Sequence, residues 1–169
     1  MCQASCLVAS RNSAIYDTNW FNPSLGHNMP PARLIVCEKR GKWAVALRAR
    51  LAEHQTRLLE TRSLDECWHE LDRRPCSFLA VEVFWSNLDS ICRFLMRVGQ
   101  RYPQVRSVCV GEPDLIAGEY LLRETGALHV SYNTRQLNVA ARMARSHFAN
   151  FPAGESIKEG IWARLPWKN

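Results

Sequence analysis

Two acidic residues stand at the ends of continuous apolar runs, where a carboxylate can take part in chemistry. Glu38 follows the apolar run 34–37, and Glu82 follows the run 78–81. Such runs are typical of parallel strands that are covered by helices on both faces. The carboxyl ends of parallel strands form the usual ligand crevice of these sheets. Carboxylates gathered there can bind Mg²⁺ or attack phosphorus.

Metal or redox chemistry from cysteine and histidine is not indicated. The seven cysteines contain no CxxC pair, and four of them fall where apolar residues are expected: Cys37, Cys67, Cys92 and Cys109. Three histidines, His54, His69 and His147, have no carboxylate or cysteine at ligand spacing. We therefore expect reduced, buried thiols in a cytoplasmic protein, with no metal site and no cofactor.

Apolar runs and amphipathic segments alternate five times between residues 33 and 150. The runs predict strands at 33–38, 57–60, 77–83, 106–110 and 129–132. Helices are expected at 42–54, after Ser63, after Asn87, after Asp114 and over 137–148. Ser63 and Glu66 have capping-box spacing. The pattern predicts an α/β fold, with a five-stranded parallel sheet between helices on both faces in three α/β/α layers.

Segments of different composition flank this domain. Residues 1–32 follow neither structural period, so we expect a disordered tail; translation starting at Met29 is an alternative. Residues 151–169 form a second tail with a short amphipathic helix that includes Trp162, followed by Trp167. This tail docks either on its own domain or on a foreign protein.

The net charge of +6 points to anionic partners, yet the arginines are scattered and form no run longer than Arg73-Arg74. The scatter favours a solvated basic surface over a dedicated nucleic-acid patch. No apolar stretch approaches the ~20 residues that span a bilayer, and no export signal is indicated. We expect a soluble cytoplasmic protein with no membrane partner.

The repeat over 33–150, with Gly126-Ala127 before the last strand and Gln136-Leu137 opening the last helix, resembles the response-regulator receiver domain. The resemblance implies a flavodoxin-like fold and a role in phosphorelay, two-component signalling. It also implies a site of two acidic residues after strand one, an Asp after strand three, a Ser or Thr after strand four and a Lys after strand five.

The five positions that correspond to this site are Glu38, Lys39, Glu82, Gly111 and Asn133. Lys39 puts a cation in place of the second carboxylate, Gly111 has no hydroxyl, and Asn133 cannot neutralise a phosphate. We therefore expect a degenerate pseudo-receiver that has lost phosphotransfer and is not an enzyme. Glu82 either imitates the anion of a phosphorylated aspartate, with Lys39 as the local positive charge, or forms a compensating ion pair with Lys39.

Partner binding is the activity that remains. The resemblance implies a partner surface on helix four, strand five and helix five, so a patch of Tyr120, His129 and Tyr132 is a candidate, with ordinary edge-strand exposure as the alternative. Trp85 either caps a pocket or partner groove above the former site, or folds onto the third helix.

The leading hypothesis is a non-catalytic, receiver-like regulatory protein that binds another signalling protein. One alternative is a functional phosphoacceptor that uses Glu38 and Glu82 with Mg²⁺. A second is a nucleic-acid-associated regulator, motivated by the charge and by Arg135, Arg142 and Arg145. A flavin mononucleotide protein is disfavoured, because the loop 38–43 is not rich in Ser, Thr and Gly.

Overall fold

The computed structural model describes residues 31–52 and 57–151 and shows one parallel sheet of five strands. The strands are β1 (Leu34–Cys37), β2 (Leu58–Thr61), β3 (Phe78–Val83), β4 (Arg106–Gly111) and β5 (Ala127–Ser131). Their spatial order is β2-β1-β3-β4-β5, so β5 is an edge strand, as its polar sequence indicates. The predicted fold class is confirmed.

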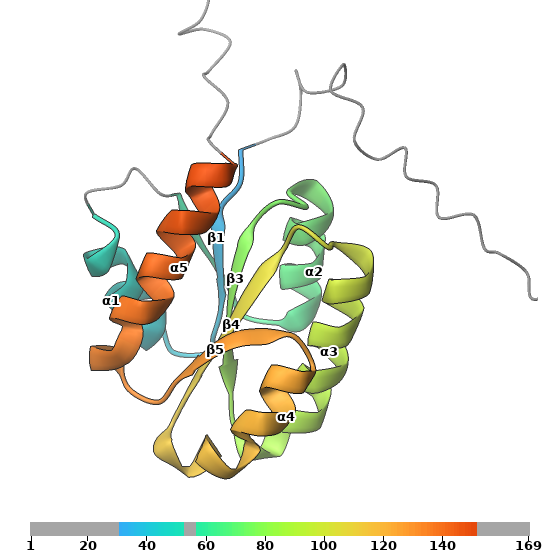
Figure 1. Cartoon of the computed structure of the whole chain (residues 1–169), viewed down its shortest axis with the longest axis vertical. Helices are drawn as coiled ribbons and strands as arrows, with labels where there is room; N and C mark the ends of the chain where they lie inside the picture. The colour runs from blue at the N-terminus through green and yellow to red at the C-terminus, as the bar shows by residue number, and fades with distance from the viewer. Residues whose placement is uncertain (1–30, 53–56, 152–169) are drawn as a thin grey trace, which may run out of the picture.

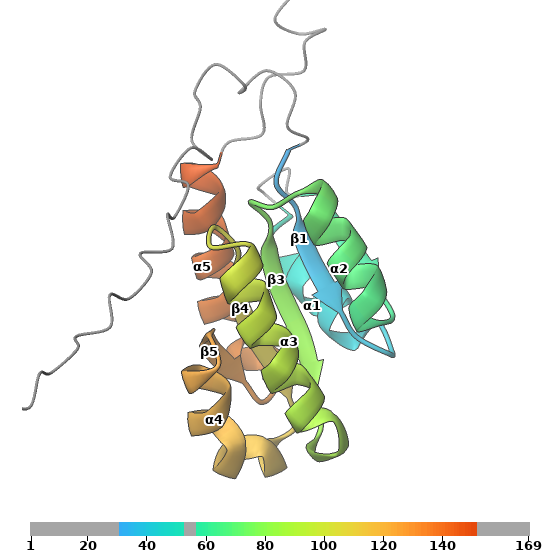
Figure 2. The ribbon, with the colours of Figure 1, turned by 90° about the vertical axis from the view of Figure 1, so that its right-hand side faces the viewer.

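Helices cover both faces of the sheet (Figures 1 and 2). One layer is formed by α1 (Lys42–Arg50) and α5 (Leu137–Asn150), and the other by α2 (Leu64–Arg73), α3 (Leu88–Arg101) and α4 (Glu119–Glu124). Short 3₁₀ helices precede three of them: η2 (Trp85–Asn87), η3 (Pro113–Gly118) and η4 (Thr134–Gln136). In the described residues, no helix is long and apolar enough to cross a membrane.

Alternate residues of the strands feed two separate cores, because successive side chains of a strand point to opposite faces. Leu34 and Val36 pack with Trp43 of α1 and with the alanines of α5. Ile35 and Cys37 belong to the core under α2 and α3. Cys37, Cys67, Cys92 and Cys109 are buried and free, as expected. Burial on both faces explains why the strands are apolar throughout.

The start of α2 agrees with the cap predicted from the sequence, whereas the starts of α3 and α4 differ from the predicted ones. Ser63 caps α2 by accepting from Glu66 N at 3.1 Å, although the Glu66 carboxylate accepts from Arg62 N instead of Ser63 N. Asn87, predicted to cap α3, makes no such cap; its side chain accepts from Phe84 N at 2.7 Å.

The fourth helix is shorter than predicted. Asp114 opens no α-helix, because the chain forms η3 there and α4 starts at Glu119. Gly118 ends η3 where the side chains of Leu88 and Trp85 come close: a Cβ at Gly118 would lie 3.3 Å from Leu88 Cδ2 and 3.6 Å from Trp85 Cη2. A residue without a side chain is suited to this contact but weakens a helix interior.

Candidate functional site

Glu38 lies directly after β1 and binds the first turn of α1. Its Oε2 accepts from Trp43 N at 2.9 Å and its Oε1 from Ala44 N at 2.6 Å, and the residue is 2% exposed. The first amides of a helix have no partners within the helix and carry partial positive charge, so a carboxylate is well suited to them. Both oxygens of Glu38 therefore hold α1 against the sheet.

Glu82 is the fifth residue of β3, and its carboxylate accepts hydrogen bonds from two donors, one in the loop after β1 and one in α1. Its Oε2 accepts from Lys39 N at 2.9 Å, and its Oε1 accepts from the indole Nε1 of Trp43 at 3.1 Å. The residue is 8% exposed. A buried carboxylate needs such donors to offset the loss of water. Each oxygen of Glu82 is thus occupied by a fixed N–H group.

Trp43 connects the two glutamates, and the sequence did not indicate this role. Its main-chain N donates to Glu38, its indole N–H donates to Glu82, and the residue is 1% exposed. From the sequence, Trp43 was only an apolar residue of the predicted helix 42–54. The signal that could have found it is the indole N–H, which usually has a hydrogen-bond partner when a tryptophan is buried.

The side chain of Lys39 does not pair with Glu82, which corrects the compensating ion pair that the sequence offered as one of two roles. Lys39 and Glu82, two described residues, form no ion pair; only the main-chain N of Lys39 reaches the carboxylate. The Lys39 Nζ lies 6.0 Å from the centroid of the Phe84 ring. Lys42 Nζ forms an ion pair with Glu112 Oε1 at 2.8 Å and lies 4.8 Å from the centroid of the Trp43 ring.

Gly111, at the end of β4, leaves no room for the missing hydroxyl. A Cβ at this position would lie 2.3 Å from Leu115 Cδ1 and 2.8 Å from Val83 O. Leu115 is fully buried and occupies the space that a side chain would need. A residue without a side chain is therefore required here for η3 to pack closely against β3 and β4.

Asn133 has a local structural task after β5. Its Oδ1 accepts from Gln136 N at 3.1 Å and caps η4, while the residue itself is exposed. An amide that caps a short helix satisfies an otherwise unpaired donor, as Asn commonly does. It carries no charge for an anion at the strand ends.

The two glutamates at the strand ends are therefore both engaged in hydrogen bonds. The parallel register sets Cys37 beside Val81 and Glu82 beside Val110, which brings Glu38 and Glu82 to one edge of the sheet as predicted. Within the parts of the chain that the structure describes, no group of three or more His, Cys, Asp or Glu could hold a metal ion. The oxygens suited to Mg²⁺ face N–H donors instead.

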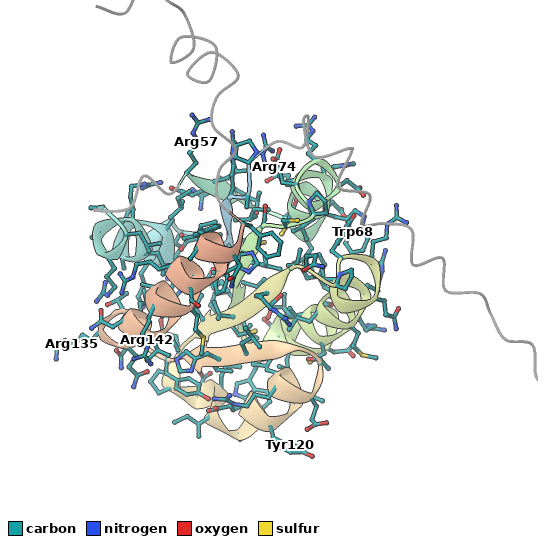
Figure 3. All side chains as sticks on the ribbon, turned by 45° about the horizontal axis from the view of Figure 1, so that its top comes forward. Arg57, Trp68, Arg74, Tyr120, Arg135 and Arg142 are labelled. Atoms are coloured by element: carbon teal, nitrogen blue, oxygen red, sulfur yellow. The ribbon has the colours of Figure 1, made fainter. Side chains whose placement is uncertain are left out.

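The predicted partner patch separates into residues of different kinds. Tyr120 is 75% exposed and projects from α4 (Figure 3). The Tyr132 hydroxyl donates to Glu119, and burial together with this bond raises the pKa of Tyr132. The same bond and the neighbouring Arg123 lower the pKa of Glu119. His129 is half-buried, and burial lowers its pKa.

Three exposed apolar side chains accompany Tyr120, and the sequence analysis did not single them out. Ile116 of η3 is 60% exposed, Leu121 of α4 is 47% exposed, and Leu128 of β5 is 41% exposed. We call Ile116, Tyr120, Leu121 and Leu128 the α4–β5 patch; Leu128 stands at its margin, on the α5 side of β5, where it lines a hollow with Met143 and Ser146. Clustered exposed apolar side chains are a mark of protein-binding surfaces.

Trp85 lies beside the connection between β4 and α4. Its Nε1 donates to Asp114 O at 3.1 Å, and it is 49% exposed. This bond ties η2 to η3; whether Trp85 also packs on the third helix or caps a partner groove stays a prediction. Trp162 and Trp167 lie outside the described residues, as do residues 1–30 of the predicted tail 1–32.

Similarity to known proteins is found in the fold and not in the sequence. No family model and no curated protein matches this chain. A CheY-like protein, tadZ, from Pseudomonas aeruginosa PAO1 matches with a TM-score of 0.55 and 18% identity over 67% of this chain and 92% of its own.

Two further structures agree in fold. An atypical orphan response regulator, described as having a phosphorylation-independent regulatory mechanism, matches with a TM-score of 0.59 and 15% identity over 72% of this chain and 99% of its own. The receiver domain of NtrC4 from Aquifex aeolicus matches with a TM-score of 0.57 and 13% identity over 70% and 97%. The domain thus has the CheY-like receiver fold, the flavodoxin-like topology of response-regulator receivers.

Proposed function

We propose that this protein is a receiver-fold regulator that works by binding another protein and carries out no phosphotransfer. The observation that supports this most directly is the occupation of Glu82: Lys39 N and Trp43 Nε1 hold its two oxygens in a site that is 8% exposed. A phosphoacceptor must present a free oxygen to phosphorus. Glu82 would have to give up a buried hydrogen bond first.

The surroundings of Glu82 support the same conclusion. Phosphoryl transfer needs oxygen ligands for Mg²⁺ and donors for the phosphoryl oxygens. Glu38 is engaged with α1, the place of the hydroxyl is filled by Leu115, and Asn133 caps η4. The orphan regulator of the same fold described as phosphorylation-independent offers a precedent for regulation without this chemistry.

The α4–β5 patch is the surface on which we place the partner. Tyr120 is 75% exposed, its neighbours in sequence Ile116 and Leu121 are also exposed in part, and tyrosine is enriched at protein interfaces because it offers a large apolar area with a polar end. Exposed Tyr and Leu side chains on a short helix and an adjacent edge strand suit a protein partner better than a small ligand.

Incubation with acetyl phosphate and Mg²⁺, followed by intact mass measurement, tests the loss of phosphotransfer. A phosphorylatable receiver treated in parallel shows that the reagent is active. We expect no phosphoryl adduct on this protein. A base-labile adduct that disappears in Glu82→Gln would overturn the proposal and establish the phosphoacceptor alternative.

Affinity capture from native extract tests the partner surface. Tyr120→Ala should lose the specifically captured protein, whereas Met96→Ala, which removes an exposed side chain of α3, should retain it. Loss of the protein with both variants, or with neither, contradicts the assignment to the α4–β5 patch.

The permanently active state that the sequence suggested for Glu82 is a finer hypothesis within this proposal. Glu82 fixes a negative charge where a receiver would gain one, and it links β3 to α1 through Trp43. This hypothesis is tested by measuring the partner's affinity for Glu82→Gln and for the unaltered protein at equal folded concentration. Unchanged affinity would mean that Glu82 is structural only.

A further inference from the structure

Charge is divided unequally between the two helical layers. The segments α1, η4 and α5 contain six basic residues and no acidic residue: Lys42, Arg48, Arg50, Arg135, Arg142 and Arg145. The helices of the opposite layer are of mixed charge, with seven acidic side chains and five arginines: Asp65, Glu66, Glu70, Asp72, Asp89, Glu119 and Glu124, and Arg73, Arg93, Arg97, Arg101 and Arg123. We call the surface of α1, η4 and α5 the basic face.

Neutral groups position the cations in the middle of this face. Arg50 Nε donates to Asn138 Oδ1 at 2.8 Å and Arg50 Nη1 to Ala46 O at 2.9 Å, while Arg145 Nη1 donates to Arg50 O at 3.3 Å. These bonds join α1 to α5 without cancelling the charge of either guanidinium. Among the described residues, the ion pairs of this face lie at its rim, where Lys42 meets Glu112 and Arg48 meets Glu60.

Arg135 of η4 and Arg142 in the second turn of α5 extend the face. Both are exposed, and Figure 3 shows them on the side of the molecule that α5 covers. The strand of a duplex carries a phosphate about every 3.4 Å of its axis, so neighbouring phosphates offer a separate contact to each guanidinium group.

We propose that the basic face binds the phosphate backbone of duplex nucleic acid without reading its sequence. The exposed apolar anchors that a protein partner would need lie mostly elsewhere, on the α4–β5 patch, and Val45 is the only large apolar side chain of the described basic face that is exposed. A helix that lies in a membrane interface likewise buries an apolar face. Arginines with polar neighbours such as Asn138 and Ser146 match phosphate contacts, which position a protein but specify no base.

Fluorescence anisotropy of the full chain with a labelled duplex DNA of mixed sequence tests this proposal. At about 50 mM salt we expect binding in the micromolar range, with affinity that falls steeply as salt rises. Arg135→Gln combined with Arg142→Gln should weaken binding at least about tenfold and reduce the salt slope by about 2, since two phosphate contacts are lost.

Arg93→Gln combined with Arg101→Gln is the matched control, because it removes the same charge from α3 in the opposite layer. This control should change affinity less than about twofold at the same salt. Absence of binding, or an equal loss in both double variants, would overturn the proposal. Vesicles containing phosphatidylserine are the last probe. Binding to them and not to DNA, with loss of that binding in the Arg135→Gln, Arg142→Gln variant, would overturn the proposal and assign the face to a membrane.

Discussion

The indole Nε1 of Trp43 in α1 donates to Oε1 of Glu82 in β3 at a distance of 3.1 Å. The two residues are 39 positions apart in the chain and both are buried. The bond joins a helix of one layer to the central strand of the sheet, at the edge where the receiver fold has its phosphorylation site. This bond occupies a carboxylate oxygen that phosphoryl transfer would need, so it is the first contact to test.

Glu82→Gln should lower the free energy of unfolding by about 1–3 kcal/mol. Two N–H donors, from Lys39 and Trp43, meet this side chain, so the new amide must turn its own N–H toward one of them. When Trp43→Phe is already present, Glu82→Gln should cost less, since no indole N–H remains. Urea unfolding of the single and double variants measures this coupling, and strictly additive costs would contradict it.

Glu38→Gln should also destabilise the protein by about 1–3 kcal/mol, because one of the amides of Trp43 and Ala44 would face an N–H group. Glu112→Gln is the comparison, since it removes a carboxylate whose ion pair with Lys42 is exposed. A surface pair contributes at most about 1 kcal/mol, so this variant should unfold close to the unaltered protein. Equal effects of the two changes would show that Glu38 does not hold α1.

Gly111→Ala should destabilise the protein by about 1–3 kcal/mol, since its Cβ would meet Leu115 and the main-chain oxygen of Val83. Gly99→Ala in α3 is the matched control, because a Cβ there meets no atom within 4 Å. This second change should stabilise the helix by about 0.5–1 kcal/mol. Thermal unfolding of the two variants should thus shift in opposite directions; a harmless Gly111→Ala would mean that Leu115 does not fill the site.

Stability should fall as the pH drops below 6.5, the ordinary pKa of histidine, in part because of His147. Burial lowers the pKa of His147, and its Nε2 lies 2.8 Å from Cys76 O as a donor. The unfolded chain takes up the proton at a higher pH than the folded one, so the contribution is complete above pH 6.5 and is lost as the pH falls through the lowered value.

Urea unfolding between pH 7 and pH 5 checks this dependence. His147→Gln should make the curve flatter in this window, since its amide can still donate to the Cys76 carbonyl but does not titrate. The exposed His69 supplies the control, and His69→Gln should leave the slope as it was. A slope that His147→Gln does not alter would assign the dependence to another group.

The sequence by itself determined the architecture and the identity of the residues at the strand ends. Apolar runs and amphipathic segments are local patterns, and they located the strands, the last helix and the cap at Ser63. The parallel order of strands then had to bring Glu38 and Glu82 to one edge. These features follow from the spacing of apolar residues over a few positions, which can be read directly from one sequence.

Only the tertiary structure decided which donors meet the two glutamates. The contact of Trp43 with Glu82 depends on how α1 packs across β1 and β3, and the filling of Gly111 depends on where η3 turns back. The basic face was likewise hidden, because the cations of α1 and α5 come together only when these two helices pack against each other. Local periodicity fixes which way a side chain points within its element, whereas its partners are set by packing between segments far apart in the chain.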